Sequence, residues 1–307
     1  MVIAIVRRIA SGLLAVLLAS LLAFAILEAS PGDIVQTLLG DESTIEQQMT
    51  LRSELNLDQP FHVRFLTYLA NLLQGDLGVS LINGRPVAEI IVHRFINTLL
   101  LTCLSTTLAV VVGFSLGAWS ALHHKGLIDM AVIVLTALCL AIPSFGIAIF
   151  LTQIFSVHLK LLPVVGGGSL KHFILPCLSL AIPTAAVITR LVRARMLDEI
   201  NKQYTLTARA KGLSNKQVWL RHIFPNALIP AVTMVGVQFG HLLGGAFVVE
   251  TLFAWPGLGR LTVQAIFDQD YPVVLAAVIL SALIFQVLNS MVDILHRQLD
   301  PLIREGD

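Results

Sequence analysis

The sequence predicts an all-α integral membrane protein with six transmembrane helices and with both termini on the cytoplasmic side. Of its 307 residues, 56% are hydrophobic and only 13% are charged, about half of the charged share of an ordinary soluble domain. The mean hydropathy is +0.84, which is more apolar surface than a soluble chain can hide behind a polar exterior. Six apolar runs are long enough to cross the hydrocarbon of a bilayer.

The six runs define the predicted spans. They are residues 9–27, 97–122, 130–157, 173–189, 226–249 and 271–292. The first run follows Arg7 and Arg8, as the core of a secretory signal would. Its 19 apolar residues exceed the roughly 7–15 of a signal core, and Leu27-Glu28-Ala29 is a poor cleavage site. We therefore expect the first run to be a retained span.

The orientation follows from the distribution of Lys and Arg, which gather in cytoplasmic loops. With the N-terminus inside, the inside segments hold 13 of these residues and the outside segments hold seven. The predicted organisation is a first span at 1–29, an external insert at 30–92, a core of five spans at 93–298 and a cytoplasmic tail at 299–307. The net charge of +1 gives no indication of a nucleic-acid partner.

The external insert contains one stretch with helical periodicity. Apolar residues at Phe61, Phe65, Tyr68, Leu69 and Leu72 fall on one face of a helix. We expect this helix to lie along the membrane surface or to cover the outer mouth of the bundle.

Prolines and glycines mark particular points of the spans. Pro143, Pro176 and Pro183 lie within the third and fourth spans, where proline removes a backbone donor and kinks a helix. Four-residue spacing puts small residues on one face, where a second helix can approach closely. The glycines with this spacing are Gly113 and Gly117, and Gly236, Gly240 and Gly244.

The loop between the fourth and fifth spans, residues 196–225, predicts a cytoplasmic helical hairpin. Its first half, 196–211, has few helix breakers, and Gly212 is placed to end that helix. Ser214 and Gln217 have the spacing of a capping box, and the second helix is expected to end near Pro225. Such a hairpin suits docking of a soluble protein. A basic loop that only follows the topology rule is the alternative, and a DNA-binding motif is disfavoured because the flanking spans leave no room for a duplex.

The hairpin sequence also resembles a family signature. Thr207-Ala208-Arg209-Ala210-Lys211-Gly212, followed by Arg221 to Pro230, is similar to the loop of ABC importer permeases. That loop is written E-A-A, three residues, Gly, nine residues, then I-x-L-P. Gly212 takes the Gly place and Phe224-Pro225 the L-P place, whereas Leu206 stands for the Glu and His222 for the Ile. These departures resemble the dipeptide/oligopeptide/nickel subfamily.

The resemblance extends along the whole chain and is to the first of two paired permeases. Similar stretches are 56–60, 75–80, 250–261 and 270–272. The resemblance implies a type I importer bundle with a coupling helix in the bacterial inner membrane, a sister permease forming a heterodimer, two ATPase subunits and an extracytoplasmic binding protein. ATP and Mg²⁺ would bind to the ATPases, which leaves no cofactor or catalysis to this chain, and the sequence has no phosphate-binding G-x-x-x-x-G-K-[ST] motif.

The resemblance also assigns roles within the hairpin. The ATPase contact would be made by Leu206, Thr207, Ala208, Arg209, Ala210, Lys211, Gly212 and Leu213. The residues that would support the hairpin are Ser214, Gln217, His222, Phe224 and Pro225.

Polar groups inside spans are costly and suggest function. Met234, Gln238 and His241 share one face of the fifth span and could line the transport pathway, although a histidine that only bonds a neighbouring helix is the alternative. Glu28 and Glu250 are expected to reach water or headgroups at outer span ends. Asp293 and His296 are expected to pair at the membrane interface.

Two questions stay open from the sequence. The cargo is either a peptide or a nickel or metal-chelate complex, and the three dispersed cysteines form no metal motif. A secondary transporter without ATPase partners is the rival function, although the repeated halves typical of that class are not found. An intramembrane hydrolase would need a nucleophile and a base within reach, and no such motif stands out.

Overall fold

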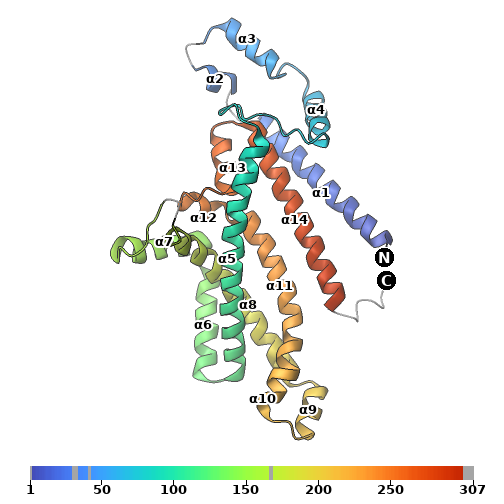
Figure 1. Ribbon diagram of the computed structural model, residues 1–307, viewed down its shortest axis with the longest axis vertical. Coiled ribbons are helices and arrows are strands. Elements are labelled where there is room, and N and C mark those ends of the chain that lie inside the picture. Colours follow the sequence, from blue (N-terminus) through green and yellow to red (C-terminus); the bar gives the residue numbers. More distant parts are fainter. Residues whose placement is uncertain (1, 30–33, 41–42, 166–168, 300–307) are drawn as a thin grey trace. The chain divides into compact units, whose positions relative to one another are not determined.

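The computed structural model describes residues 2–29, 34–40, 43–165 and 169–299. Within these ranges the chain is a succession of helices (Figure 1), with one isolated antiparallel bridge between Val79 and Pro86. The helices are α1 (Val2–Ala29), α2 (Ile34–Leu39), α3 (Ile45–Glu54), α4 (Phe61–Leu73), α5 (Val87–Leu122), α6 (Leu127–Ala141), α7 (Ser144–Thr152), η1 (Gln153–His158), α8 (Lys171–Ile200), α9 (Gln203–Ala210), α10 (Asn215–Val218), η2 (Trp219–Ile223), α11 (Phe224–Gly245), α12 (Phe247–Leu252), α13 (Leu258–Phe267) and α14 (Tyr271–Leu299).

Among the described residues, five helices are long and apolar enough to cross a membrane, and there are six if the bent pair α6 and α7–η1 is one span. The predicted kink at Pro143 in the span over 130–157 is confirmed, and the chain turns there by 100° between the two helices. Pro143 disfavours helical geometry at the residue before it, and Ile142 is extended, with φ −101° and ψ 125°. Pro176 and Pro183, in contrast, lie inside α8, which continues through both.

The chain divides into two compact units. Unit 1 comprises residues 1–98 and 256–286, and unit 2 comprises residues 99–255 and 287–307. The division passes through α5 and α14, so each of these helices contributes one end to each unit.

Unit 1 is built where α4 packs on the end of α1. Phe24 of α1 makes edge-on contacts with Phe61 and Phe65, with ring centroids 5.3 and 5.5 Å apart. Beside them, an ion pair of 2.8 Å joins Arg64 to Glu28. The predicted helix over the Phe61 stripe is therefore confirmed, and its apolar face covers α1.

Unit 1 also joins α5 to the segment that carries α13. The Asn97 amide donates to the Pro256 carbonyl at 2.9 Å, and the Leu258 N–H donates to the Thr98 hydroxyl at 2.8 Å. Since Asn97 and Thr98 lie on α5 while residues 256–258 begin α13, these bonds fix the start of α13 against α5.

Unit 2 is organised around α8, which packs against α6, α7 and α11. The predicted role of the glycines in close packing is confirmed at α5. A Cβ added to Gly113 would lie 2.8 Å from Ile188, and one added to Gly117 would lie 2.8 Å from the Thr189 carbonyl oxygen. At Gly236 an added Cβ would overlap Val292. The backbones of these helices can approach so closely only because the glycines have no side chain.

Candidate functional site

The hairpin between α8 and α11 consists of α9, a tight turn, α10 and η2 (Figure 1). The prediction of one helix over 196–211 was wrong, because α8 ends at Ile200 and α9 begins at Gln203. Lys202 is extended between them, with φ −73° and ψ 148°. The Glu199 carbonyl accepts from the Thr205 hydroxyl at 2.9 Å and from the Lys202 N–H at 3.3 Å, so this carbonyl at the end of α8 keeps its hydrogen bonds across the break.

The turn after α9 is a Schellman motif centred on Gly212. Gly212 has φ +83°, a conformation that a side chain disfavours. Its N–H donates to the Arg209 carbonyl at 2.9 Å, and the Leu213 N–H donates to the Ala208 carbonyl at 3.3 Å. These two bonds satisfy the last carbonyls of α9. The predicted helix-ending role of Gly212 is confirmed.

The next helix begins with the predicted capping box. The Gln217 N–H donates to the Ser214 hydroxyl at 3.4 Å, and the Ser214 N–H donates to the Gln217 side-chain carbonyl at 3.0 Å. Two N–H groups that would lack helical partners are thereby satisfied.

Helix α10 does not end near Pro225, as was predicted. It passes through the π turn η2 directly into α11, with Pro225 in the first turn of α11. The Phe224 N–H bonds the Trp219 carbonyl, five residues back. Because the turn is already widened before Pro225, the missing N–H of proline interrupts the bonding pattern without ending the helix.

The residues assigned to the ATPase contact divide by exposure. Leu206 is 54% exposed, and Thr207, Arg209, Ala210, Lys211 and Gly212 are also exposed. Ala208 is buried in a cluster with Val218, Ile223 and Ala227. The surface of the hairpin that a partner can reach therefore excludes Ala208, which holds α9 against the following helix.

A polar brace that the sequence did not reveal ties this hairpin to both flanking spans. The buried Glu199 carboxylate accepts from Lys202 Nζ at 2.6 Å and from the Tyr204 hydroxyl. The Asn226 amide of α11 donates to that hydroxyl at 3.3 Å and to the His222 carbonyl at 2.7 Å. Burial and the Glu199 carboxylate both raise the pKa of Tyr204, and the bond to Glu199 raises the pKa of Lys202. The sequence did contain one signal for this brace, since Glu199 lies three positions before Lys202, a spacing at which the two side chains can pair.

A second missed cluster surrounds Asp129, at the start of α6. Its carboxylate is 3% exposed and is joined to Arg193 of α8, with Nε 2.6 Å from Oδ1 and Nη2 2.8 Å from Oδ2. The Ser120 hydroxyl donates to Oδ1 at 2.6 Å, and the Lys125 N–H donates to Oδ2 at 2.9 Å. The cluster links α5, α6 and the turn between them to the helix that leads into the hairpin.

The predicted pathway residues lie on α11. Met234 and Gln238 are half-buried, whereas His241 is exposed and takes part in an interaction. Across the described residues, no three His, Cys, Asp or Glu side chains are grouped as metal ligands would be.

Two predictions about acidic residues have different outcomes. Glu250 was expected to reach water, but it is completely buried in α12 and takes part in an interaction, so that expectation was wrong. Glu28 is 40% exposed while it pairs with Arg64. The side chains of Asp293 and His296 lie outside the described residues.

The long apolar helices define a multi-pass helical membrane protein, with a helical hairpin between α8 and α11. The chain belongs to the family described as the binding-protein-dependent transport system inner membrane component, whose model matches residues 113–305. The model for the N-terminal part of such membrane components matches residues 1–102.

The curated relatives match along nearly the whole chain. The glutathione transport system permease protein GsiC of Salmonella choleraesuis is 41% identical over 300 residues, which cover 98% of each chain. GsiC of Escherichia coli strain K12 is 40% identical with the same coverage. The chain is therefore a multi-pass inner membrane permease subunit of an ABC importer.

Solved structures support the fold. A chain of the methionine ABC transporter MetNI in an inward-facing conformation matches with a TM-score of 0.59 at 19% identity, over 69% of this chain and 97% of that one. An amino acid ABC transporter crystallised with histidines matches with a TM-score of 0.56 at 17% identity, over 69% of this chain and 94% of that one.

Proposed function

We propose that this chain forms, with a sister permease in a heterodimer, the membrane pathway of an importer for short peptides of the glutathione kind. An extracytoplasmic binding protein delivers the peptide, and two ATPase subunits bind and hydrolyse ATP with Mg²⁺. The observation that carries the cargo is the 41% identity to a glutathione permease over 98% of both chains. A nickel chelate, the other cargo that the subfamily resemblance implies, has no comparable support.

The hairpin supports the proposed coupling to an ATPase. Its exposed surface at Leu206 and residues 209–212 is held on a short, doubly capped turn. A partner that displaces this turn also displaces α8, because Thr205 is hydrogen-bonded to Glu199 at the end of α8. It displaces α11 as well, because the helix continues from α10 through η2 into α11 and Asn226 bonds the His222 carbonyl. The hairpin thus passes a movement of the ATPase to two spans of unit 2.

The importer proposal is tested by uptake. A strain deleted for this gene alone is compared with its parent for uptake of tritiated glutathione and of radioactive nickel, free or chelated by histidine. We expect loss of glutathione uptake and unchanged nickel uptake, with restoration by the wild-type gene. Loss of nickel uptake alone contradicts the peptide cargo, and uptake that continues without the ATPase genes favours a secondary transporter.

The docking surface is tested by a matched pair of variants. Leu206→Asp places a charge on the exposed face of α9, and Leu73→Asp places one at the exposed end of α4 in the external insert, where Leu73 is 89% exposed. We expect Leu206→Asp to lower co-purification of the ATPase subunits severalfold, and Leu73→Asp to leave it unchanged. Equal co-purification in the two variants would move the ATPase contact away from α9.

A further inference from the structure

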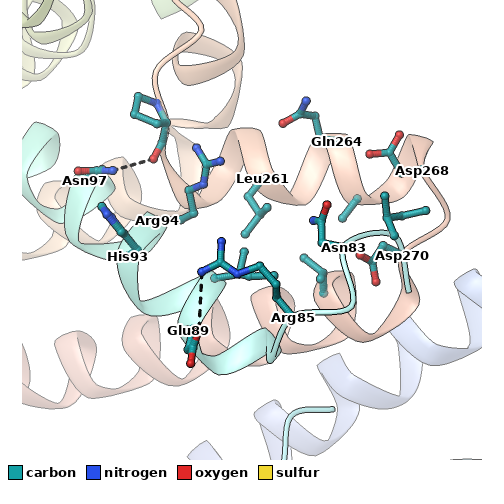
Figure 2. Close-up of a pocket in the computed structure, with 15 residues that line it drawn as sticks. Asn83, Arg85, Glu89, His93, Arg94, Asn97, Leu261, Gln264, Asp268 and Asp270 are labelled. Carbon is teal, nitrogen blue, oxygen red and sulfur yellow. Dashed lines mark hydrogen bonds and ion pairs between the residues drawn. The ribbon is translucent and has the colours of Figure 1, made fainter. Parts of the chain in front are cut away.

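Unit 1 contains a pocket of about 680 Å³ on the side that the predicted orientation places outside the membrane (Figure 2). It lies between the turn at residues 82–85, the first turns of α5 and one face of α13. Two sets of bonds hold its walls. Asn97 and Thr98 fix the start of α13 against α5, while the Asp270 carboxylate after α13 accepts from the Ser80 hydroxyl and the Leu81 N–H.

Most of the charged groups in this pocket are already committed to the protein. Arg85 pairs with Glu89 at 3.6 Å, and the buried Asp270 holds the turn at Ser80. Arg94 and Asp268 also line the pocket, and among the described residues neither side chain makes a hydrogen bond or an ion pair. The Arg94 cation and the Asp268 anion are therefore available to bind a ligand.

These two groups lie toward opposite ends of α13. Arg94 is one turn before Thr98, which bonds Leu258 at the first residue of α13, and Asp268 immediately follows the last residue. Figure 2 shows the Arg94 and Asp268 side chains on either side of Gln264. Ten helical residues extend about 15 Å at 1.5 Å per residue. The charged termini of an extended tripeptide are separated by about 10 Å at 3.3–3.6 Å per residue, and long side chains such as arginine can make up the difference.

We propose that this pocket binds a short zwitterionic peptide on the external face of the permease, with its carboxylate at Arg94 and its ammonium group at Asp268. The proposal rests on the proposed function, because it assigns the imported peptide a binding site on the permease itself. Gln264 and Asn83, which line the same space, offer amide donors and acceptors to the peptide backbone. Arginine binds a carboxylate through paired N–H groups, so the site discriminates against peptides with a blocked C-terminus.

The test measures binding of tritiated trialanine to the complete transporter, permeases with ATPases, in lipid nanodiscs without the binding protein. The variants are Arg94→Gln and Asp268→Asn. The matched controls are Arg52→Gln and Asp58→Asn, which alter external charges that do not line the pocket. We expect each pocket variant to raise the Kd about tenfold or more, which corresponds to 1.4 kcal/mol, and the controls to leave it unchanged.

Blocked peptides assign each end. Trialanine amide lacks the carboxylate proposed to bind Arg94, so it is expected to bind weakly and equally to the wild-type complex and to Arg94→Gln. N-acetyl-trialanine lacks the ammonium group proposed to bind Asp268, so it is expected to bind equally to the wild-type complex and to Asp268→Asn. Failure of the wild-type complex to bind trialanine, or a Kd that neither pocket variant changes, overturns the proposal. A separate assay measures docking of the binding protein to the same nanodiscs. The proposal is also overturned if the variants weaken this docking and leave trialanine binding unchanged, since the pocket would then be a protein-docking surface.

Peptide uptake by cells, measured in parallel, separates the two levels of inference. Uptake that depends on this gene while trialanine binding is insensitive to Arg94 and Asp268 removes the pocket and leaves the importer proposal standing. Uptake of glutathione and trialanine that is unchanged by deletion of the gene removes the importer proposal.

Discussion

Arg193 and Asp129 form a two-bonded ion pair that joins α8 to the start of α6, with both contacts at 2.8 Å or less. The carboxylate is 3% exposed, and Ser120 and the Lys125 N–H supply further donors. A buried carboxylate is stabilised only when its bonds are complete. The pair therefore fixes α8, the helix that leads into the hairpin, to the α5–α6 turn.

Removal of one partner of this pair should destabilise the protein. Arg193→Gln leaves the Asp129 charge buried with incomplete bonding, so we expect the free energy of unfolding to fall by about 3 kcal/mol. Thermal unfolding of the purified transporter in detergent measures the change. The control is Arg195→Gln, whose pair with Asp198 is exposed and 4.0 Å long, and whose loss should cost less than about 1 kcal/mol. Equal effects of the two substitutions would contradict a structural role for Asp129.

The turn at Gly212 should be sensitive to backbone strain and not to volume. An added Cβ meets no atom within 4 Å, but φ is +83°, so Gly212→Val costs about 1–2 kcal/mol in local conformation alone. We expect this variant to hydrolyse ATP without matching uptake in proteoliposomes. Gly212→Asn, which tolerates positive φ better, should retain most of the coupling. Normal coupled uptake by the valine variant would show that the turn does not transmit motion.

The capping box offers a matched comparison between the two units. Ser214→Ala removes the cap of α10, and Thr44→Ala removes the same type of cap from α3 in the external insert. Each change should cost about 1 kcal/mol of helix stability. We expect only Ser214→Ala to lower the uptake obtained per ATP hydrolysed. If both substitutions reduce coupling alike, the effect reflects general stability and not the hairpin.

The phenol of Tyr68 predicts a measurable pH dependence. Its hydroxyl is buried without a hydrogen-bond partner among the described residues, and burial raises its pKa to about 12. Tyr68 in the unfolded chain ionises near the usual value of about 10. The contribution of Tyr68 to stability is therefore constant below pH 10 and falls as the pH rises from 10 to 12. The titration uses a Tyr204→Phe background, because the pKa of Tyr204 is also raised. In that background, absorbance should show a late phenolate transition that Tyr68→Phe abolishes. The phenylalanine variant should be as stable as the wild type or more stable, since an unsatisfied hydroxyl is lost. A late transition that persists in this variant would assign it to another tyrosine.

Local rules predicted the features that depend on neighbouring residues. The apolar runs located the spans, the spacing of Ser214 and Gln217 predicted the cap, and Gly212 predicted the end of α9. The effect of each proline depends on its surroundings, which local rules do not supply. The kink predicted at Pro143 is present, whereas the helix end predicted near Pro225 is absent, because the π turn before Pro225 has already altered the bonding pattern.

The polar clusters were beyond sequence reasoning for another reason. Asp129 and Arg193 are 64 positions apart, and Glu199 meets the Tyr204 hydroxyl, which Asn226 of α11 also contacts. Such partners are set by helix packing and not by spacing along the chain. The same holds for Arg94 and Asp268, which only the folded unit 1 places on one pocket.

The absence of a break between Asn215 and Gly245 has a mechanical consequence. These 31 residues form a rod about 45 Å long at 1.5 Å per residue. A helix of this length that tilts as one body acts as a lever: a tilt of about 5° about one end displaces the other end by about 4 Å, about the spacing of one residue along an extended chain. A small rotation of the hairpin is thereby amplified at the far end of α11.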